Sequence, residues 1–116
     1  MTYYDHQSCI EACLKCATVC HHCARMDLRE RDVEMMKQCI QTNMECAAAC
    51  ETAAKLMAMG SKYAWRMCRL CADVCLACAE ECSRHRSDHC KECAAVCHDC
   101  ADECKRMYSK TEKQVQ

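Results

Sequence analysis

The stretch Cys9-x-x-x-Cys13-x-x-Cys16-x-x-x-Cys20-x-x-Cys23 repeats a thiol at alternating intervals of four and three residues. An α-helix brings residues at these intervals onto one stripe of its surface. Such a stripe normally carries Leu, Ile or Val and faces the core. The same spacing recurs twice, at Cys68, Cys71, Cys75, Cys78, Cys82 and at Cys90, Cys93, Cys97, Cys100, Cys104. The pattern therefore predicts helices whose inward stripes are made of cysteine.

The composition fits one helical domain. The chain has 116 residues, one Gly and no Pro, so its length suits a single domain and few positions interrupt a helix. A net charge of −1 gives no basic surface for nucleic acid. No apolar run approaches the ~20 residues of a membrane span. We therefore expect neither a nucleic acid nor a membrane as a partner.

Four helices are predicted, at about 5–26, 32–60, 61–85 and 87–107, and the charged segment 27–31 is expected to turn the chain. Asp32 can cap the second helix, and Gly60 suits a left-handed position at its end. Short connections make successive helices antiparallel. We expect an all-α, up-down-up-down four-helix bundle with a cysteine-lined core over residues 1–108, followed by a frayed polar C-terminal tail at 109–116.

The second helix departs from the pattern of the other three. Its inward stripe is Met36, Cys39, Asn43, Cys46, Cys50, Ala53 and Met57. A buried Asn43 can hydrogen-bond sulfur, or it can fix the register of the helix as a buried Asn does in coiled coils. The sequence leaves both hypotheses open.

Eighteen cysteines in a chain of this size suggest either a disulfide scaffold or a metal-binding core. Disulfide scaffolds are rich in loops, whereas this chain almost lacks Gly and Pro. Bridges between residues three or four apart in one helix also need strained geometry. The N-terminal residues lack the basic and apolar segments of a secretory signal, so we expect a cytoplasmic protein whose thiols stay reduced.

The choice of metal depends on ligand softness and geometry. Thiolate and thioether ligands suit Cu(I), zinc and iron–sulfur clusters. Structural zinc and iron–sulfur sites take four ligands each, usually from loops or helix ends. A helical stripe instead presents a continuous row of sulfur, which suits many Cu(I) ions that share thiolates. Copper fits best; a zinc reservoir and a ferredoxin-like electron carrier remain alternatives. A thiol oxidoreductase would need an exposed cysteine pair of low pKa.

The chain resembles the copper storage proteins, in particular their cytosolic branch. The resemblance covers nearly the whole chain and rests on the three five-cysteine stripes. It also includes the segment Cys46-Ala47-Ala48-Ala49-Cys50 and the segment His89-Cys90-Lys91-Glu92-Cys93-Ala94.

This resemblance implies a homotetramer of bundles that bind multiple Cu(I) ions through all eighteen cysteines, for storage or detoxification rather than catalysis. A copper chaperone or efflux protein is a further expected partner. The end of the bundle near the 27–31 turn would be the mouth through which copper passes. Met26, His85 and His89 are the additional expected ligands there, with Met35 and Met36 as further candidates.

Other histidines and the aromatic residues complete the expectations. His6 lies three residues before Cys9 on the same stripe and can be a ligand or a packing residue. His21, His22 and His98 lie off the stripes and are predicted to be surface residues. The aromatic residues should gather at the end opposite the mouth, as a hydrophobic collar or a subunit contact: Tyr3, Tyr4, Tyr63, Trp65 and Tyr108.

Overall fold

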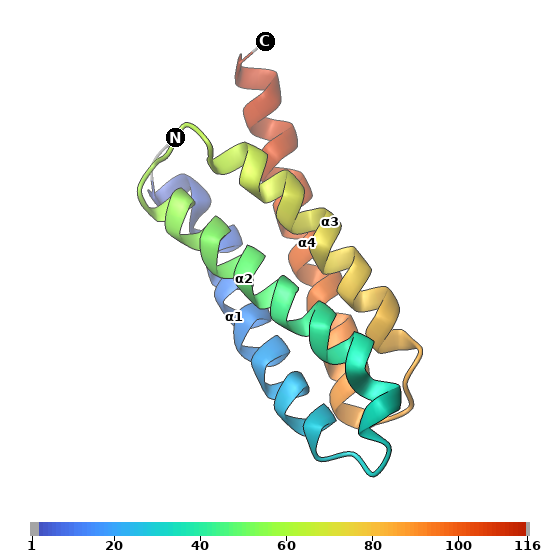
Figure 1. The fold of residues 1–116 in the computed structure, drawn as a ribbon. Helices are drawn as coiled ribbons and strands as arrows, with labels where there is room; N and C mark the ends of the chain where they lie inside the picture. Colours follow the sequence, from blue (N-terminus) through green and yellow to red (C-terminus); the bar gives the residue numbers. More distant parts are fainter. Residues whose placement is uncertain (1–2, 116) are drawn as a thin grey trace.

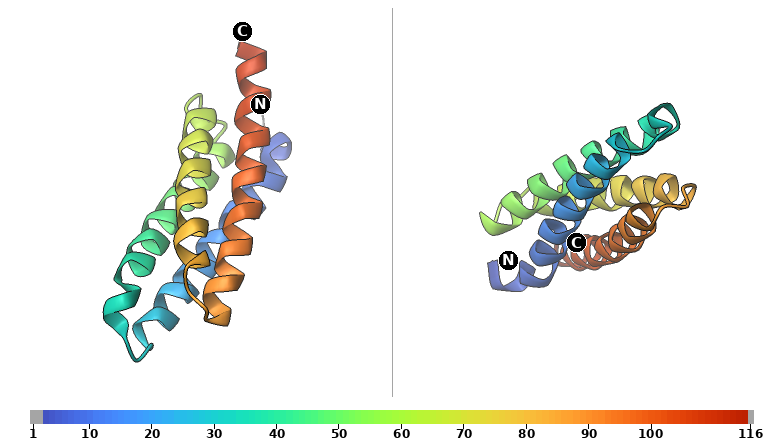
Figure 2. Two further views of the ribbon diagram at one scale, coloured as in Figure 1. Left: turned by 90° about the vertical axis from the view of Figure 1, so that its right-hand side faces the viewer. Right: turned by 90° about the horizontal axis from the view of Figure 1, so that it is seen from below.

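A computed structural model describes residues 3–115, with side chains described for 6–109. Within this range the chain forms four α-helices and one short 3-10 helix (Figure 1). The elements are α1 (Tyr3–Leu28), η1 (Val33–Met36), α2 (Lys37–Ala58), α3 (Ala64–Ser83) and α4 (Asp88–Val115). Each helix packs against two neighbours: α1 contacts α2 and α4, and α3 contacts the same two helices from the opposite corner of the bundle. The predicted antiparallel four-helix bundle is confirmed (Figure 2).

The connection between α1 and α2 starts later than expected. Asp27 and Leu28 belong to α1, and the chain turns only after them, where the amide of Glu30 donates to the carbonyl of Asp27 at 3.1 Å. Asp32 then caps η1, its carboxylate accepting from the amide of Met35 at 3.4 Å. The expectation that Asp27 lies in the turn was therefore wrong, and its side chain follows the helical phase of the cysteines.

Gly60 ends the α2 segment with a φ of 64°, the left-handed conformation that glycine adopts without a steric penalty. The prediction for this residue is confirmed. Ser61 follows, and its hydroxyl accepts from the amide of Tyr63 at 3.1 Å. The helix α3 begins at Ala64, three residues after the expected cap.

The helix α4 runs to Val115, whereas we expected it to end near Met107. It continues past the other helices at the end of the bundle where the N-terminus lies (Figures 1 and 2). The segment after Met107 contains neither Gly nor Pro and is rich in Lys, Glu and Gln, which favour helix even without tertiary contacts. The backbone is thus helical where the sequence suggested a frayed tail, and the fraying itself stays a prediction.

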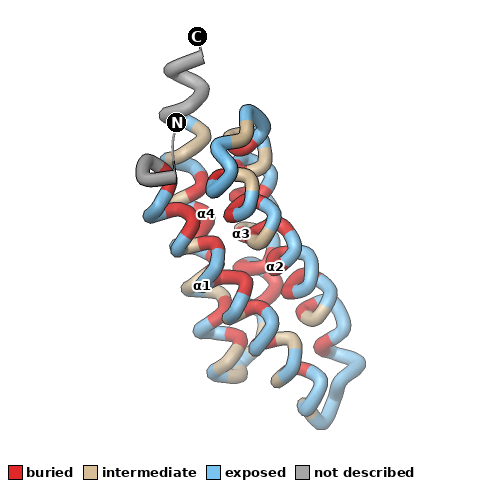
Figure 3. Tube along the Cα trace, turned by 90° about the vertical axis from the view of Figure 1, so that its left-hand side faces the viewer, coloured by how far each residue is buried: buried red, intermediate tan, exposed pale blue. Residues whose placement is uncertain are grey.

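The core lies along the axis of the bundle, where buried residues line the inner side of each helix (Figure 3). The cysteine stripes make up most of it, each thiol being at most 1% exposed. Small buried alanines flank the stripes, among them Ala17, Ala47, Ala72, Ala79 and Ala101. Their size lets the helix backbones approach closely, which brings sulfur atoms on different helices into contact.

Candidate metal centre

All eighteen cysteines are free thiols and all are buried. Their Sγ atoms contact one another at distances from 3.6 Å, between Cys46 and Cys75, to 4.0 Å, between Cys16 and Cys20. We call this set of sulfur atoms the thiol ladder. Inward-facing cysteines were predicted at every one of these positions, and the burial confirms that orientation.

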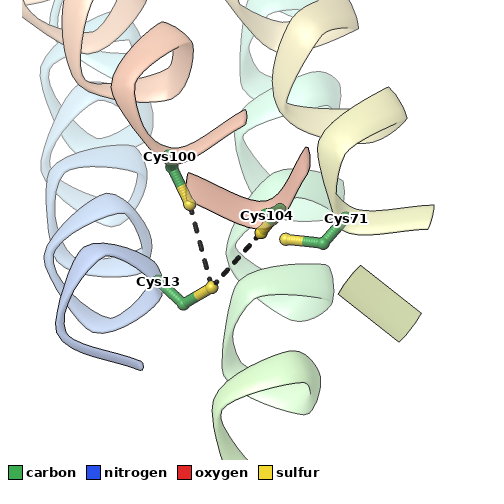
Figure 4. Close-up of side chains that lie close together, drawn as sticks. All are labelled: Cys13, Cys71, Cys100 and Cys104. Carbon is green, nitrogen blue, oxygen red and sulfur yellow. Dashed lines mark hydrogen bonds between the residues drawn. The ribbon is translucent and has the colours of Figure 1, made fainter. Parts of the chain in front are cut away.

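Groups of four thiols lie along the ladder with all their Sγ atoms within 4.8 Å of one another. One group joins three helices: Cys13 from α1, Cys71 from α3, and Cys100 and Cys104 from α4 (Figure 4). Successive groups share members, since Cys50 belongs to one group with Cys16 and to another with Cys100. Shared thiols suit metal ions that are linked by bridging thiolates, whereas an isolated zinc site needs four ligands of its own.

Asn43 lies among the thiols rather than beside them. Its side-chain oxygen accepts from Cys93 at 3.1 Å, from Cys78 at 3.2 Å and from Cys82 at 3.8 Å. Its amide nitrogen donates to the sulfur of Cys39 at 3.6 Å. Of the two hypotheses for Asn43, these contacts favour the direct interaction with sulfur.

Asp27 is the functional candidate that the sequence reasoning missed. Its side chain is fully buried and accepts from the amide of Asn43 at 3.4 Å and from the thiol of Cys90 at 3.4 Å. The thiol of Cys23 donates to both carboxylate oxygens at 4.0 Å. The signal was present in the spacing, because Asp27 follows Cys23 by four residues and so continues the alternation of four and three.

The mouth is the end of the bundle formed by Cys23, Asp27, Cys39, Cys82 and Cys90. His89 closes one side of it, its Nε2 lying 3.0 Å from Asp27 Oδ1 and 3.6 Å from Glu30 Oε1. His85 is held by the largely buried Glu81, 2.8 Å from its Nε2. Both rings are slightly exposed, at 12% for His89 and 13% for His85, so they lie between solvent and the thiols.

The methionines expected near the mouth differ in exposure. Met26 is half-buried and Met36 is buried, whereas Met35 is 68% exposed. The structure therefore brings Met36 to the core and directs Met35 to solvent. The predicted ligand Met26 lies on α1 at the border between the two environments.

The far end of the bundle is formed by His6, Cys9, Met57, Cys68 and Cys104. The sulfur atoms of Cys9 and Cys104 lie 3.7 Å apart, and Met57 is fully buried. Tyr108 packs against this core, but Tyr63 is exposed. The collar hypothesis is wrong for Tyr63; the side chains of Tyr3 and Tyr4 lie outside the described residues.

The remaining histidines lie on the surface. His21, His22 and His98 are all exposed, and His21 pairs with Glu51 across α1 and α2 at 3.0 Å. The prediction that these three are surface residues is confirmed.

Burial changes the proton affinity of the thiols. Desolvation raises the pKa of Cys90 to about 12, and the negative charge of Asp27 adds to the rise. Hydrogen bonds with neighbouring thiols, chiefly that of Cys16, together with burial raise the pKa of Cys20 above its usual range. These groups are therefore neutral thiols near pH 7, and a metal ion that binds them must displace protons.

Comparison with known proteins identifies relatives of this chain. A family model described as copper storage protein matches residues 3–109. A cysteine-rich protein of Bacillus subtilis (strain 168), YhjQ, is 42% identical over 83 residues, which cover 72% of this chain and 77% of that protein. Its description says that it is uncharacterised.

Solved structures show the same fold. The Cu(I)-bound copper storage protein BsCsp3, from Bacillus subtilis, has a TM-score of 0.86 and 41% identity, covering 89% of this chain and 97% of its own. A cytosolic copper storage protein from Streptomyces lividans, with five coppers, has a TM-score of 0.87 and 34% identity, covering 92% and 94%. Over the described residues, none of the helices combines the length and apolar character that a bilayer crossing demands.

Proposed function

Because this chain belongs to the copper storage protein family, we propose that it stores Cu(I), with the buried thiols of the ladder as thiolate ligands once their protons are displaced. Its role is to hold many ions per chain, as a reserve or for detoxification, and not to catalyse a reaction. We infer a cytoplasmic location, by analogy with the cytosolic relative from Streptomyces lividans.

The observation that carries this proposal is the contact of buried thiols at 3.6 to 4.0 Å along the core. Cu(I) is a soft ion that accepts few ligands and tolerates bridging sulfur. A ladder of shared thiols can therefore hold ions along its whole length. Zinc and iron–sulfur sites need separate sets of four ligands, so the zinc reservoir and the ferredoxin-like carrier are less well supported.

The proposed ligands are the eighteen cysteines, with Met26, His85 and His89 at the mouth. The slightly exposed rings of His85 and His89 support a role in receiving Cu(I) from solvent or from a donor protein. Asp27 would assist, because its carboxylate contacts both His89 and Cys90. A copper chaperone or an efflux protein would exchange copper at this end.

We also propose a homotetramer whose storage unit is residues 1–108 of each chain, with residues 109–116 outside it. Leu14 on α1 and Leu70 on α3 are 50% and 52% exposed, and a contact between subunits would bury them. Sedimentation of the protein with and without Cu(I) would measure the number of chains.

The decisive experiment is an anaerobic titration of the reduced protein with Cu(I) in competition with a chromophoric Cu(I) chelator. We expect many ions to be retained per chain before the chelator takes up metal. Retention of only one or two ions would indicate a transfer protein and would overturn the storage function. A parallel titration with zinc is the control, and Cu(I) should displace any zinc that binds.

A further inference from the structure

Glu81 is a buried acidic residue that lies beside the mouth without bonding to a thiol. It is on α3, one residue before Cys82, and its side chain is 10% exposed. One carboxylate oxygen lies 3.1 Å from Nη1 of Arg84, and the other lies 2.8 Å from Nε2 of His85. Within the described part of the chain, these are the only hydrogen-bond and ion-pair partners of the carboxylate. A buried carboxylate needs such partners, and here they restrain the end of α3.

The contact with Glu81 determines which nitrogen of His85 carries a proton. A carboxylate that also pairs with an arginine only accepts, so Nε2 of the neutral ring is the donor and the lone pair is on Nδ1. The residues with described side chains provide no hydrogen-bond partner for Nδ1. Histidines that bind metals usually donate their other N–H to a carboxylate or a carbonyl in this way, which orients the ring and raises the basicity of the ligand nitrogen.

We propose that Glu81 is a positioning residue of the mouth: its carboxylate holds Nε2 of His85, so that the ring presents Nδ1 as the nitrogen that receives Cu(I). The inference rests on the role of His85 in the proposed storage function. Binding involves no change of oxidation state, because Nδ1 donates its lone pair and Nε2 keeps its proton. The neutral ring therefore accepts the ion without first losing a proton, whereas the buried thiols must release theirs.

The other histidine of the mouth is held less independently of the thiols. Nε2 of His89 lies 3.0 Å from Oδ1 of Asp27, and the same oxygen accepts from the thiol of Cys90 at 3.4 Å. Loading of Cys90 removes that thiol proton and so changes the contacts of Asp27. Because the partners of Glu81 are Arg84 and His85 alone, its hold on His85 should not change as the ladder fills.

The first test compares Glu81→Ala with the matched control Glu80→Ala. Glu80 is exposed and pairs with the same Arg84, at 3.1 Å, but not with His85. In stopped-flow transfer of Cu(I) from a chelator, the Glu81→Ala protein should load about tenfold more slowly than the wild type, as for loss of a group that orients a metal-binding histidine. The control should load at the wild-type rate. Equal rates for the two variants would overturn the proposal.

Two further variants separate positioning from a general loss of structure. Glu81→Gln keeps an oxygen that can accept from Nε2, so it should recover most of the rate, and a rate as low as that of Glu81→Ala would contradict positioning. In a protein that already carries His85→Ala, adding Glu81→Ala should cause no further decrease, since Glu81 acts through that ring. A second decrease would mean that Glu81 acts by another route.

A measurement on the unaltered protein does not depend on how the variants fold. Cu(I) is diamagnetic, so the ring nitrogens of the ¹⁵N-labelled histidines can be followed by NMR during anaerobic loading. The Nδ1 resonance of His85 should shift while Nε2 keeps its proton, and the exposed ring of His98 should not change. A His85 ring that is unchanged, or that binds through Nε2, in a protein that retains many ions contradicts this inference alone. Retention of only one or two ions contradicts the storage function itself.

Discussion

The side-chain amide of Asn43, on α2, donates to the buried carboxylate of Asp27, on α1, at 3.4 Å. Asn43 accepts a hydrogen bond from Cys93 of the thiol ladder, and Asp27 accepts one from Cys90 at the mouth. The pair therefore links the two regions by hydrogen bonds. A polar pair inside a sulfur core thus orders both the apo structure and the region through which copper is proposed to pass.

Replacing Asn43 with Ala should destabilise the apo protein. The change leaves Asp27 without its amide donor and removes the acceptor of several buried thiols, and an unsatisfied buried polar group costs about 1–3 kcal/mol. Anaerobic urea unfolding would measure the free-energy change. The control is Gln41→Ala, since Gln41 is exposed and its side-chain amide donates to Glu45; equal stability of the two variants would count against the role of Asn43.

Replacing His89 with Ala should slow Cu(I) uptake and leave the number of stored ions nearly unchanged. His89 lies beside Asp27 at the mouth, away from the inner thiols. Because His89 is proposed to receive the incoming ion, we expect its loss to decrease the uptake rate by about tenfold, the order of magnitude that loss of one group at a metal site costs. Stopped-flow transfer of Cu(I) from a chelator would measure it. His98→Ala, an exposed change on the same helix, should load at the wild-type rate; if the two variants load equally fast, uptake does not depend on His89.

The apo protein should lose stability as the pH rises above 9. Burial raises the pKa of Cys90 from its ordinary 9.0 to about 12 in the folded protein. The folded state therefore holds this proton more tightly than the unfolded state, so the contribution to stability is fully present below pH 9 and is lost as the pH rises toward about 12. Thermal unfolding under anaerobic, reducing conditions from pH 7 to 11 would measure this. A melting temperature that rises with pH across this window would contradict the assignment.

Loading with Cu(I) should release protons and raise the melting temperature. Ions that bind only the folded state stabilise it by about 2.7 kcal/mol for one site when free Cu(I) is a hundredfold above its Kd. Calorimetry and a pH indicator in weak buffer would record both effects. The apo protein should keep its helical circular dichroism, because its helices already pack through the small alanines and thiols. Loss of helix on removal of copper would show that the ions are needed for folding.

Replacing Ala53 with Cys should add a storage position. Ala53 is fully buried on the stripe of α2, three residues after Cys50, so the new thiol would face the ladder. We expect one more Cu(I) ion per chain, and an apo protein less stable by about 1–3 kcal/mol if the added atom crowds the core. Ala48→Cys, an exposed position of the same helix, is the control and should add no ion that withstands the chelator. Equal capacity of both variants would mean that the ladder does not extend to this position.

Asp27 and the end of α4 show why parts of the structure escaped prediction. Asp27 has the correct helical phase, but a carboxylate next to charged residues is usually solvated, and only the tertiary structure provides His89, Asn43 and Cys90 as its partners. Residues after Met107 form helix from local propensity, although polar composition at a chain end favours the expectation of fraying.

The spacing of the cysteines determined by itself that the chain forms helices, that the thiols face inward and that the core suits a soft metal, because helical periodicity is a local property of the sequence. The tertiary structure decided which thiols meet across helices, how Asn43 contacts sulfur, and that the two ends of the bundle differ in their polar groups. These features depend on the relative height and rotation of four packed helices. Contacts between residues as distant as Cys9 and Cys104 arise only after that packing is complete.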